Sequence, residues 1–173
     1  PICCETMQRF ARALEPAGFP PEAMTPAYGL AEATLCLAAK PKGALPGSHS
    51  LSRDALDLYR PVRDSAKGAV LASVGTPVHG MELRVAGSRG EVLPEGHMGH
   101  IEARGPSICQ GYLGEEPMAA GAWLRTGDIG VVRDGELLVA GREKDVFIVG
   151  GRNIHAHDVE AVATGTGAAR PGK

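Results

Sequence analysis

Aromatic residues are scarce in this sequence of 173 residues, where three Phe, three Tyr and one Trp make up 4% of the chain. Because 43% of the residues are still hydrophobic, a core of Val, Leu, Ile and Ala is expected. No apolar run approaches the roughly 20 residues that cross a bilayer, so no membrane span is predicted. An excess of one charge is lacking too, since 18 basic and 20 acidic residues leave a net charge of -2. Binding to nucleic acid is therefore not expected.

Cysteine is also scarce, and its spacing argues against two kinds of site. The four cysteines are Cys3, Cys4, Cys36 and Cys109, and none forms a Cys-x-x-Cys pair. Neither a zinc site nor a disulfide framework is therefore predicted. We expect small buried apolar side chains and a reducing, cytoplasmic location. The N-terminus carries no charged-then-apolar signal pattern, and because the chain starts at Pro1 rather than Met, we expect either a processed start or further residues upstream.

Turn-forming residues are plentiful, with 24 Gly and 13 Pro, and they divide the chain into short elements. An amphipathic pattern predicts a helix over residues 5–15, and further helices are expected over Ala31–Ala39 and from Asp158 onward. Residues 40–69 form an irregular excursion, in which a short helical piece is expected over Ser52–Tyr59.

From Val70 onward the pattern changes to alternation with a period of two, which is typical of strands. The alternation is clearest in Met81–Val85 and Gly99–Arg104. Asp134-Gly135 lies between two apolar runs and is a strong hairpin signal. Short strands at this spacing favour a small antiparallel sheet or barrel. The predicted fold class is therefore α+β, and mainly β.

Two carboxylates stand beside glycine turns. Glu32 follows Tyr28-Gly29, and a Mg²⁺ ion that rides on ATP phosphates takes only one or two protein carboxylates. Asp128, in a Thr-Gly-Asp loop, could accept both hydroxyls of a ribose, and the guanidinium of Arg142 could reach the same sugar or a phosphate. Pairing across the hairpin would place both near one edge of the sheet. Taken singly, each motif also fits an ordinary first-turn or turn residue.

Two further patterns resemble ligand sites only superficially. Gly167–Lys173 fits G-x-x-x-x-G-K, but a helical pattern precedes it and the Ser or Thr that would hold magnesium is absent. The histidine pairs His97/His100 and His155/His157 match no metal-ligand spacing. We expect neither a P-loop nor a metal site from these residues, and we place the histidines at the surface.

In their order and spacing, the remaining motifs resemble the adenylate-forming enzymes, which include acyl-CoA synthetases, peptide-synthetase adenylation domains and luciferases. Tyr28–Leu35 is similar to the Tyr-Gly-x-(Thr/Ala)-Glu segment of that superfamily, Leu124–Asp128 to its ribose loop, and Gly141–Asn153 to its interdomain hinge. The fatty acyl-AMP ligase branch is the most similar. Ala-Glu-Ala-Thr-Leu follows Tyr-Gly-Leu, and Ser52–Leu56 resembles part of that branch's insertion.

The resemblance implies an enzyme that uses ATP to convert a fatty acid into an acyl-adenylate. The acyl group would then pass to the phosphopantetheine arm of an acyl carrier protein rather than to coenzyme A. The site residues that the resemblance implies are Glu32 for Mg²⁺ on ATP, Tyr28 and Gly29 beside the adenine, Asp128 and Arg142 for the ribose, and Lys144 as the pivot between the adenylation and transfer poses.

The same resemblance covers nearly the whole chain and divides it into four parts. Residues 1–39 would end the large α/β subdomain, 40–69 would be the insertion, 70–141 the β-barrel subdomain, and 142–173 the hinge and the start of the C-terminal domain. The family's phosphate loop and its C-terminal lysine fall outside these residues. Because adenylation depends on such charge-stabilising contacts, we expect a fragment that is inactive alone.

Two alternatives stay open at this stage. One is a fragment of an acyl-CoA ligase or of a peptide-synthetase adenylation domain, which the excursion at 40–69 would distinguish from the first interpretation. The other is a non-catalytic, β-rich interaction module from a truncated gene, which would show no response to ATP.

Overall fold

The computed structural model describes residues 2–53, 56–149 and 152–166, and its ribbon is mainly β. Antiparallel pairing joins every strand to its neighbours in the described sheets. In chain order the elements are α1 (Cys4–Leu14), η1 (Glu15–Ala17), η2 (Pro21–Ala23), β1 (Ala27–Gly29), η3 (Ala31–Ala33), β2 (Cys36–Ala39), β3 (Ser48–Leu51), β4 (Ala69–Ala72), β5 (Thr76–Pro77), β6 (Glu82–Ala86), β7 (Gly99–Arg104), β8 (Leu124–Arg133), β9 (Glu136–Arg142), η5 (Glu143–Asp145), β10 (Val146–Val149), β11 (Arg152–His155) and α2 (Ala156–Gly165).

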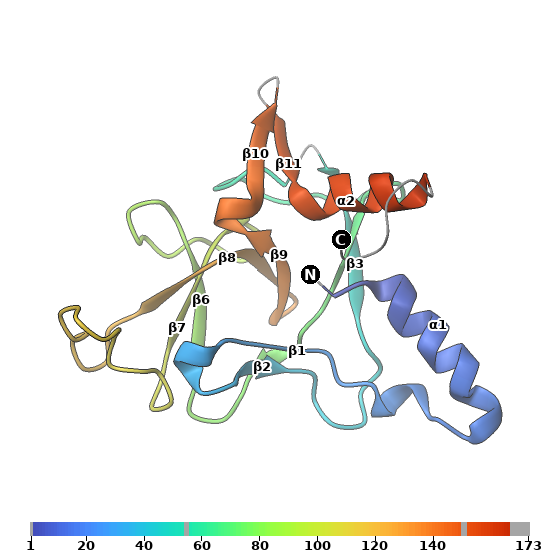
Figure 1. Cartoon of the computed structure of the whole chain (residues 1–173), viewed down its shortest axis with the longest axis horizontal. Coiled ribbons are helices and arrows are strands. Elements are labelled where there is room, and N and C mark those ends of the chain that lie inside the picture. Colours follow the sequence, from blue (N-terminus) through green and yellow to red (C-terminus); the bar gives the residue numbers. More distant parts are fainter. Residues whose placement is uncertain (1, 54–55, 150–151, 167–173) are drawn as a thin grey trace.

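A four-stranded sheet, in the order β6-β7-β8-β9, is the centre of the fold (Figure 1). It confirms the predicted strands and the hairpin, in which Asp134 and Gly135 both have positive φ, as the tight turn requires. The sheet is open rather than a closed barrel, because β6 and β9 are not hydrogen-bonded to each other. Ile101 of β7 and Leu138 of β9 are fully buried, so side chains of this sheet form much of the core.

A second sheet, in the order β1-β2-β5, corrects the helix predicted over Ala31–Ala39. Only Ala31–Ala33 is helical, as a single 3₁₀ turn, and Thr34 then takes a φ of 67° that ends it. Leu37 and Ala38 are completely buried, so β2 is a strand covered on both faces. Such strands read as continuous apolar runs, which a helical pattern can imitate.

The 40–69 excursion is more ordered than predicted, because it contains β3, which pairs with β4. The helical piece expected over Ser52–Tyr59 lies partly outside the described residues, and Leu58–Tyr59 forms a turn. Leu51 and Leu56 join the same apolar cluster as Met98. The excursion is therefore packed onto the central sheet.

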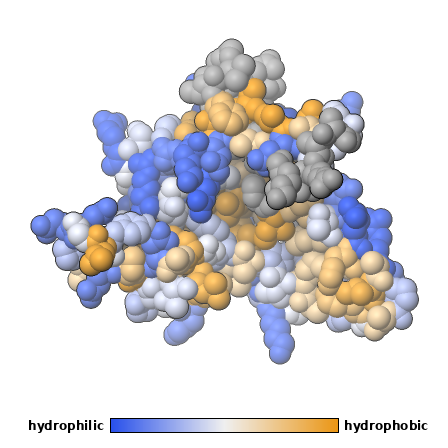
Figure 2. Space-filling view, in the orientation of Figure 1, coloured by the Kyte–Doolittle hydropathy of each residue, from blue (hydrophilic) through white to orange (hydrophobic). Residues whose placement is uncertain are grey.

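Both ends of the described chain carry exposed apolar side chains. Helix α1 confirms the prediction for 5–15 but buries none of its residues, and Phe10 and Leu14 are exposed. Near the other end, Phe147 of β10 is about half exposed. Figure 2 shows apolar surface over both of these regions. Among the described helices, none combines the length and the apolarity that a bilayer crossing requires.

Of the smaller predictions, some are confirmed and others are wrong. All four cysteines are free, as expected, but none is buried, and Cys3 is exposed. The surface position predicted for His100 is wrong, because its side chain is only 1% exposed. The predicted C-terminal helix begins at Ala156, slightly before Asp158. The side chains of His155 and His157 and the whole segment 167–173 lie outside the described residues.

Candidate functional site

Asp128 and Arg142 face each other across the hairpin. They are register partners on β8 and β9, and Arg142 Nε lies 3.4 Å from Asp128 Oδ1. The expected proximity is thus confirmed, although Asp128 belongs to a continuous strand rather than to a loop. The strand is irregular here, since Gly127 has a φ of 77° and the ladder shifts register between Ile129 and Gly130. This irregularity resembles the bulges that redirect side chains near binding sites.

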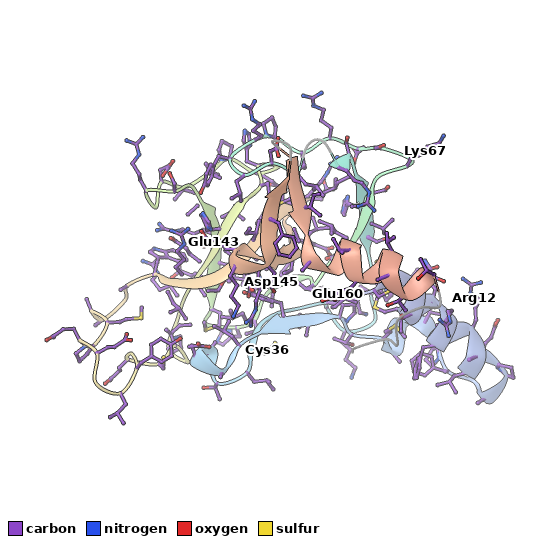
Figure 3. The ribbon with its side chains drawn as sticks, turned by 45° about the horizontal axis from the view of Figure 1, so that its top comes forward. Arg12, Cys36, Lys67, Glu143, Asp145 and Glu160 are labelled. Atoms are coloured by element: carbon purple, nitrogen blue, oxygen red, sulfur yellow. The ribbon has the colours of Figure 1, made fainter. Side chains whose placement is uncertain are left out.

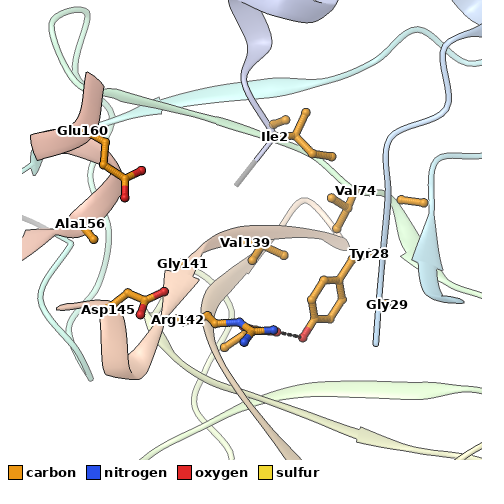
Figure 4. Close-up of a pocket in the computed structure, with 13 residues that line it drawn as sticks. Ile2, Tyr28, Gly29, Val74, Val139, Gly141, Arg142, Asp145, Ala156 and Glu160 are labelled. Carbon is orange, nitrogen blue, oxygen red and sulfur yellow. Dashed lines mark hydrogen bonds and ion pairs between the residues drawn. The ribbon is translucent and has the colours of Figure 1, made fainter. Parts of the chain in front are cut away.

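Tyr28 completes a compact polar group with these two residues, which we call the Asp128 cluster. Its hydroxyl donates a 2.6 Å hydrogen bond to Asp128 Oδ2 (Figure 4). Burial, and then the hydrogen bond to the Asp128 carboxylate, raise the pKa of Tyr28 well above its usual range. The phenol therefore stays a proton donor at every physiological pH. The Asp128 side chain is 11% exposed and that of Arg142 is 58% exposed.

Gly29 allows Tyr28 to reach this position. An ideal Cβ at residue 29 would lie 1.6 Å from the backbone oxygen of Leu35, so any side chain there would collide with the backbone that leads into β2. The β1–β2 register also shifts between Tyr28 and Gly29. The close approach of two backbones, rather than an unusual φ, explains this glycine.

Glu32 lies on the 3₁₀ turn η3, where its partly exposed side chain meets a tyrosine from a distant loop. The hydroxyl of Tyr112 donates a hydrogen bond to Glu32 Oε1, and Cys109 N donates to Glu32 O at 2.7 Å. The bond from Tyr112 lowers the pKa of the Glu32 carboxyl, so the group is charged near neutral pH. We call this pair the Glu32 contact.

Two hollows meet at the Asp128 cluster. One, of about 420 Å³, is lined by Tyr28, Gly29, Asp128 and Arg142, and it extends towards α2. Figure 4 shows the side chains around it. The other, of about 340 Å³, is lined by Asp128, Arg142, Glu32 and Lys144. The structure thus gathers all six predicted site residues around one cluster.

Comparisons with known proteins identify the family. Residues 2–113 match the AMP-binding enzyme family, which is more than half of the chain. The chain belongs to the AMP-binding enzymes. It is 36% identical to the long-chain-fatty-acid–AMP ligase FadD32 of Mycolicibacterium smegmatis, over 92% of this chain and 30% of that protein. It is 40% identical to a Caulobacter vibrioides protein provisionally named an acyl-CoA synthetase, over 91% of this chain and 29% of that protein.

Solved structures of AMP-binding enzymes show the same fold. One, from a study of fatty acyl-adenylate ligases from E. coli and L. pneumophila, has a TM-score of 0.85 and 30% identity, over 95% of this chain and 31% of that one. The adenylation domain of a keto acid-selecting NRPS module has a TM-score of 0.73 and 28% identity, over 94% and 33%. The chain therefore spans about three-tenths of the length of the relatives that it matches.

The carboxylates of this AMP-binding chain are suited to a metal that is bound mainly by ATP phosphates, rather than to a metal bound by protein side chains alone. No group of three or more His, Cys, Asp or Glu that could hold a metal occurs in the described residues. Glu32 offers a single exposed carboxylate, which suits a Mg²⁺ ion that phosphates mostly coordinate. Each oxygen of Asp128 carries two lone pairs, so both can accept a ribose hydroxyl beside their present partners.

Sequence reasoning missed Tyr112 as a partner of Glu32 in this AMP-binding chain. The two residues are 80 positions apart, and Tyr112 lies in an irregular loop. The position of Tyr112 relative to Glu32 depends on the tertiary fold rather than on a local pattern. Thr126 was also missed; its hydroxyl accepts a hydrogen bond from Asp128 N.

Proposed function

We propose that this chain is the ribose-binding and hinge part of an ATP-dependent fatty acyl-AMP ligase. In the reaction, a carboxylate oxygen of the fatty acid attacks the α-phosphorus of ATP. The bond from that phosphorus to the bridging oxygen breaks, and pyrophosphate leaves. A thiol of an acyl carrier protein then attacks the acyl carbon, and AMP leaves. Mg²⁺ on the phosphates would neutralise the charge that develops as pyrophosphate departs.

The single observation that carries this proposal is the Asp128 cluster. A buried carboxylate, fixed by a tyrosine hydroxyl and faced by a guanidinium, presents its oxygens to a hollow of nucleoside size. We assign both ribose hydroxyls to Asp128, with Arg142 beside the same sugar or the α-phosphate. Tyr28 and Gly29 would border the adenine, Glu32 would bind Mg²⁺ on the phosphates, and Lys144 would be the pivot.

The choice of fatty acids and of a carrier-protein acceptor rests on the similarity to FadD32 and on the excursion at 40–69. The Caulobacter relative favours the second candidate, an acyl-CoA ligase. The two candidates share the adenylation step and differ only in the thiol that accepts the acyl group.

The test begins with the intact mass of the protein from its source, because a chain several times heavier than 17.9 kDa is required for a complete ligase. With that full-length protein, fatty-acid-dependent ATP–pyrophosphate exchange is expected. Acyl transfer to a phosphopantetheinylated carrier protein should exceed transfer to coenzyme A. No exchange with any fatty acid would refute the proposal, and preferred transfer to coenzyme A would select the second candidate. The 173 residues alone should give no exchange.

A further inference from the structure

A buried polar group beside the hinge has no role in the site described above. Its centre is His100 of β7, whose side chain is 1% exposed. His100 Nε2 lies 2.6 Å from the Tyr59 hydroxyl and 2.7 Å from Arg125 Nη2. On the other side of the ring, Nδ1 is buried and has no hydrogen-bond partner. A buried polar atom without a partner is uncommon in proteins and calls for an explanation.

The protonation state of this ring follows from its neighbours. A guanidinium can only donate hydrogen bonds, so Nε2 must accept from Arg125. Neutral His100 therefore carries its proton on Nδ1. Burial, and then the nearby charge of Arg125, lower the pKa of His100, which agrees with a neutral ring. The unpartnered buried atom is thus an N–H donor that lacks an acceptor.

The nearest carboxylate belongs to the hinge. Glu143 is the first residue of η5 and precedes the proposed pivot, Lys144. Its Oε2 lies 3.6 Å from His100 Nδ1, just beyond hydrogen-bond length. Both of its carboxylate oxygens are 3.3 Å from Arg125 Nη2. Figure 3 places Glu143 next to Asp145 at the turn that follows the sheet.

We propose that His100 is a positioning residue for the hinge, whose Nδ1–H donates to the Glu143 carboxylate and so serves as its docking point. A movement of a few tenths of an ångström would bring Glu143 to bonding distance from the donor. His100, Arg125 and Glu143 would then hold the start of η5 against β7 and β8, which fixes the position from which the hinge turns. Tyr59 ties the 40–69 excursion to the same ring through Nε2. This assignment rests on the proposed function only in calling the turn a hinge.

Two amide substitutions of His100 test the roles of its two ring nitrogens separately. The amide nitrogen of His100→Asn can occupy the place of Nδ1 and still donate to Glu143. The longer side chain of His100→Gln keeps a polar group near Nε2, facing Tyr59 and Arg125, but loses the donor to Glu143. A purely structural role for His100 would not favour Asn over Gln.

The experiment measures the rate of trypsin cleavage at Arg142 and Lys144 in the native full-length protein. Cleavage should be about three- to tenfold faster in His100→Gln and in Glu143→Gln than in wild type, and nearly unchanged in His100→Asn. The double variant His100→Gln/Glu143→Gln should be cut no faster than either single variant. Cleavage at Lys40, which is only 5% exposed, is the internal control for global unfolding and should not change.

Equal cleavage of His100→Asn and His100→Gln, or additive effects in the double variant, would overturn the proposal. This readout does not depend on catalysis, so it stays interpretable if wild type shows no fatty-acid-dependent exchange. Where exchange is present, His100→Gln should also alter the ratio of acyl transfer to adenylation, while His100→Asn keeps the wild-type ratio. An unchanged ratio in His100→Gln would equally count against the docking role.

Discussion

The Asp128 cluster and the Glu32 contact are two tyrosine–carboxylate pairs built in opposite ways. Tyr28 is partly buried on β1 and Asp128 is buried on β8, so strands of two different sheets hold the pair, and Arg142 faces Asp128 in register. Tyr112 is exposed and Glu32 is partly exposed, and they come from a loop and a single 3₁₀ turn. A pair held by strands keeps its geometry without ligand, whereas an exposed pair can part at little cost. The first pair suits a fixed sugar, and the second suits a metal that arrives with its phosphates.

The largest expected effect concerns the backbone beside the cluster. Gly29→Ala should destabilise the fold by about 3 kcal/mol or more, because its Cβ would overlap the Leu35 carbonyl. Gly165→Ala is the matched control, since nothing lies within 4 Å of a Cβ there. It should be neutral or slightly stabilising, as alanine favours helix. Urea unfolding of both variants measures the difference, and a near-neutral Gly29→Ala would contradict this account.

The next prediction distinguishes the carboxylates of Asp128 and Glu32 by the ligand that each is expected to bind. Asp128→Asn in the full-length protein should weaken AMP binding by about ten- to a hundredfold, since hydrogen bonds to a charged group are the stronger ones. Glu32→Gln should change AMP binding in the absence of magnesium by less than about twofold. Calorimetric titration gives both values. Equal losses would mean that the two pairs do not divide sugar and metal between them.

A smaller effect is expected when the hydroxyl groups of Tyr28 and Tyr112 are removed and the losses of stability are compared. Tyr28→Phe leaves a buried acceptor without its donor and should cost about 1–3 kcal/mol of unfolding free energy. Tyr112→Phe removes an exposed bond and should cost less than about 0.5 kcal/mol. Chemical denaturation of both variants tests the ratio. If Tyr112→Phe proved the more damaging, the contrast between the pairs would fail.

The smallest effect is a dependence of stability on pH. The folded-state pKa of His100 is lowered, first by burial and then by Arg125, while Glu143 and Glu102 act in the opposite direction. The unfolded chain therefore binds a proton on His100 before the folded one does, so stability falls as pH drops below about 6.5. Thermal unfolding of His100→Asn should show a shallower loss than wild type between pH 7 and 5. Parallel pH profiles would show that His100 does not contribute.

The sequence predicted those features that local chemistry determines. Asp134-Gly135 fixed the hairpin, and the hairpin in turn placed Asp128 opposite Arg142. The strand at Gly99–Arg104 was also predicted with its observed bounds. The helix over Ala31–Ala39 failed because burial on both faces, not helical propensity, determines β2.

Contacts between distant segments could not be read from the sequence in the same way. The meeting of Tyr112 with Glu32 depends on the path of an irregular loop. The burial of His100 depends on the excursion that brings Tyr59 over β7. Neither residue belongs to a motif whose spacing would have indicated its partner.

The position of Arg142 in the chain decides which parts of the molecule could move together. Arg142 is the last residue of β9, and the 3₁₀ turn with Lys144 follows it at once. A rotation about Lys144 would therefore leave Arg142 and Asp128 on the stationary side and carry away everything from Asp145 onward. A nucleotide bound by these two side chains would stay fixed to the central sheet, while the segment beyond Lys144 brings different reactive groups to it in turn.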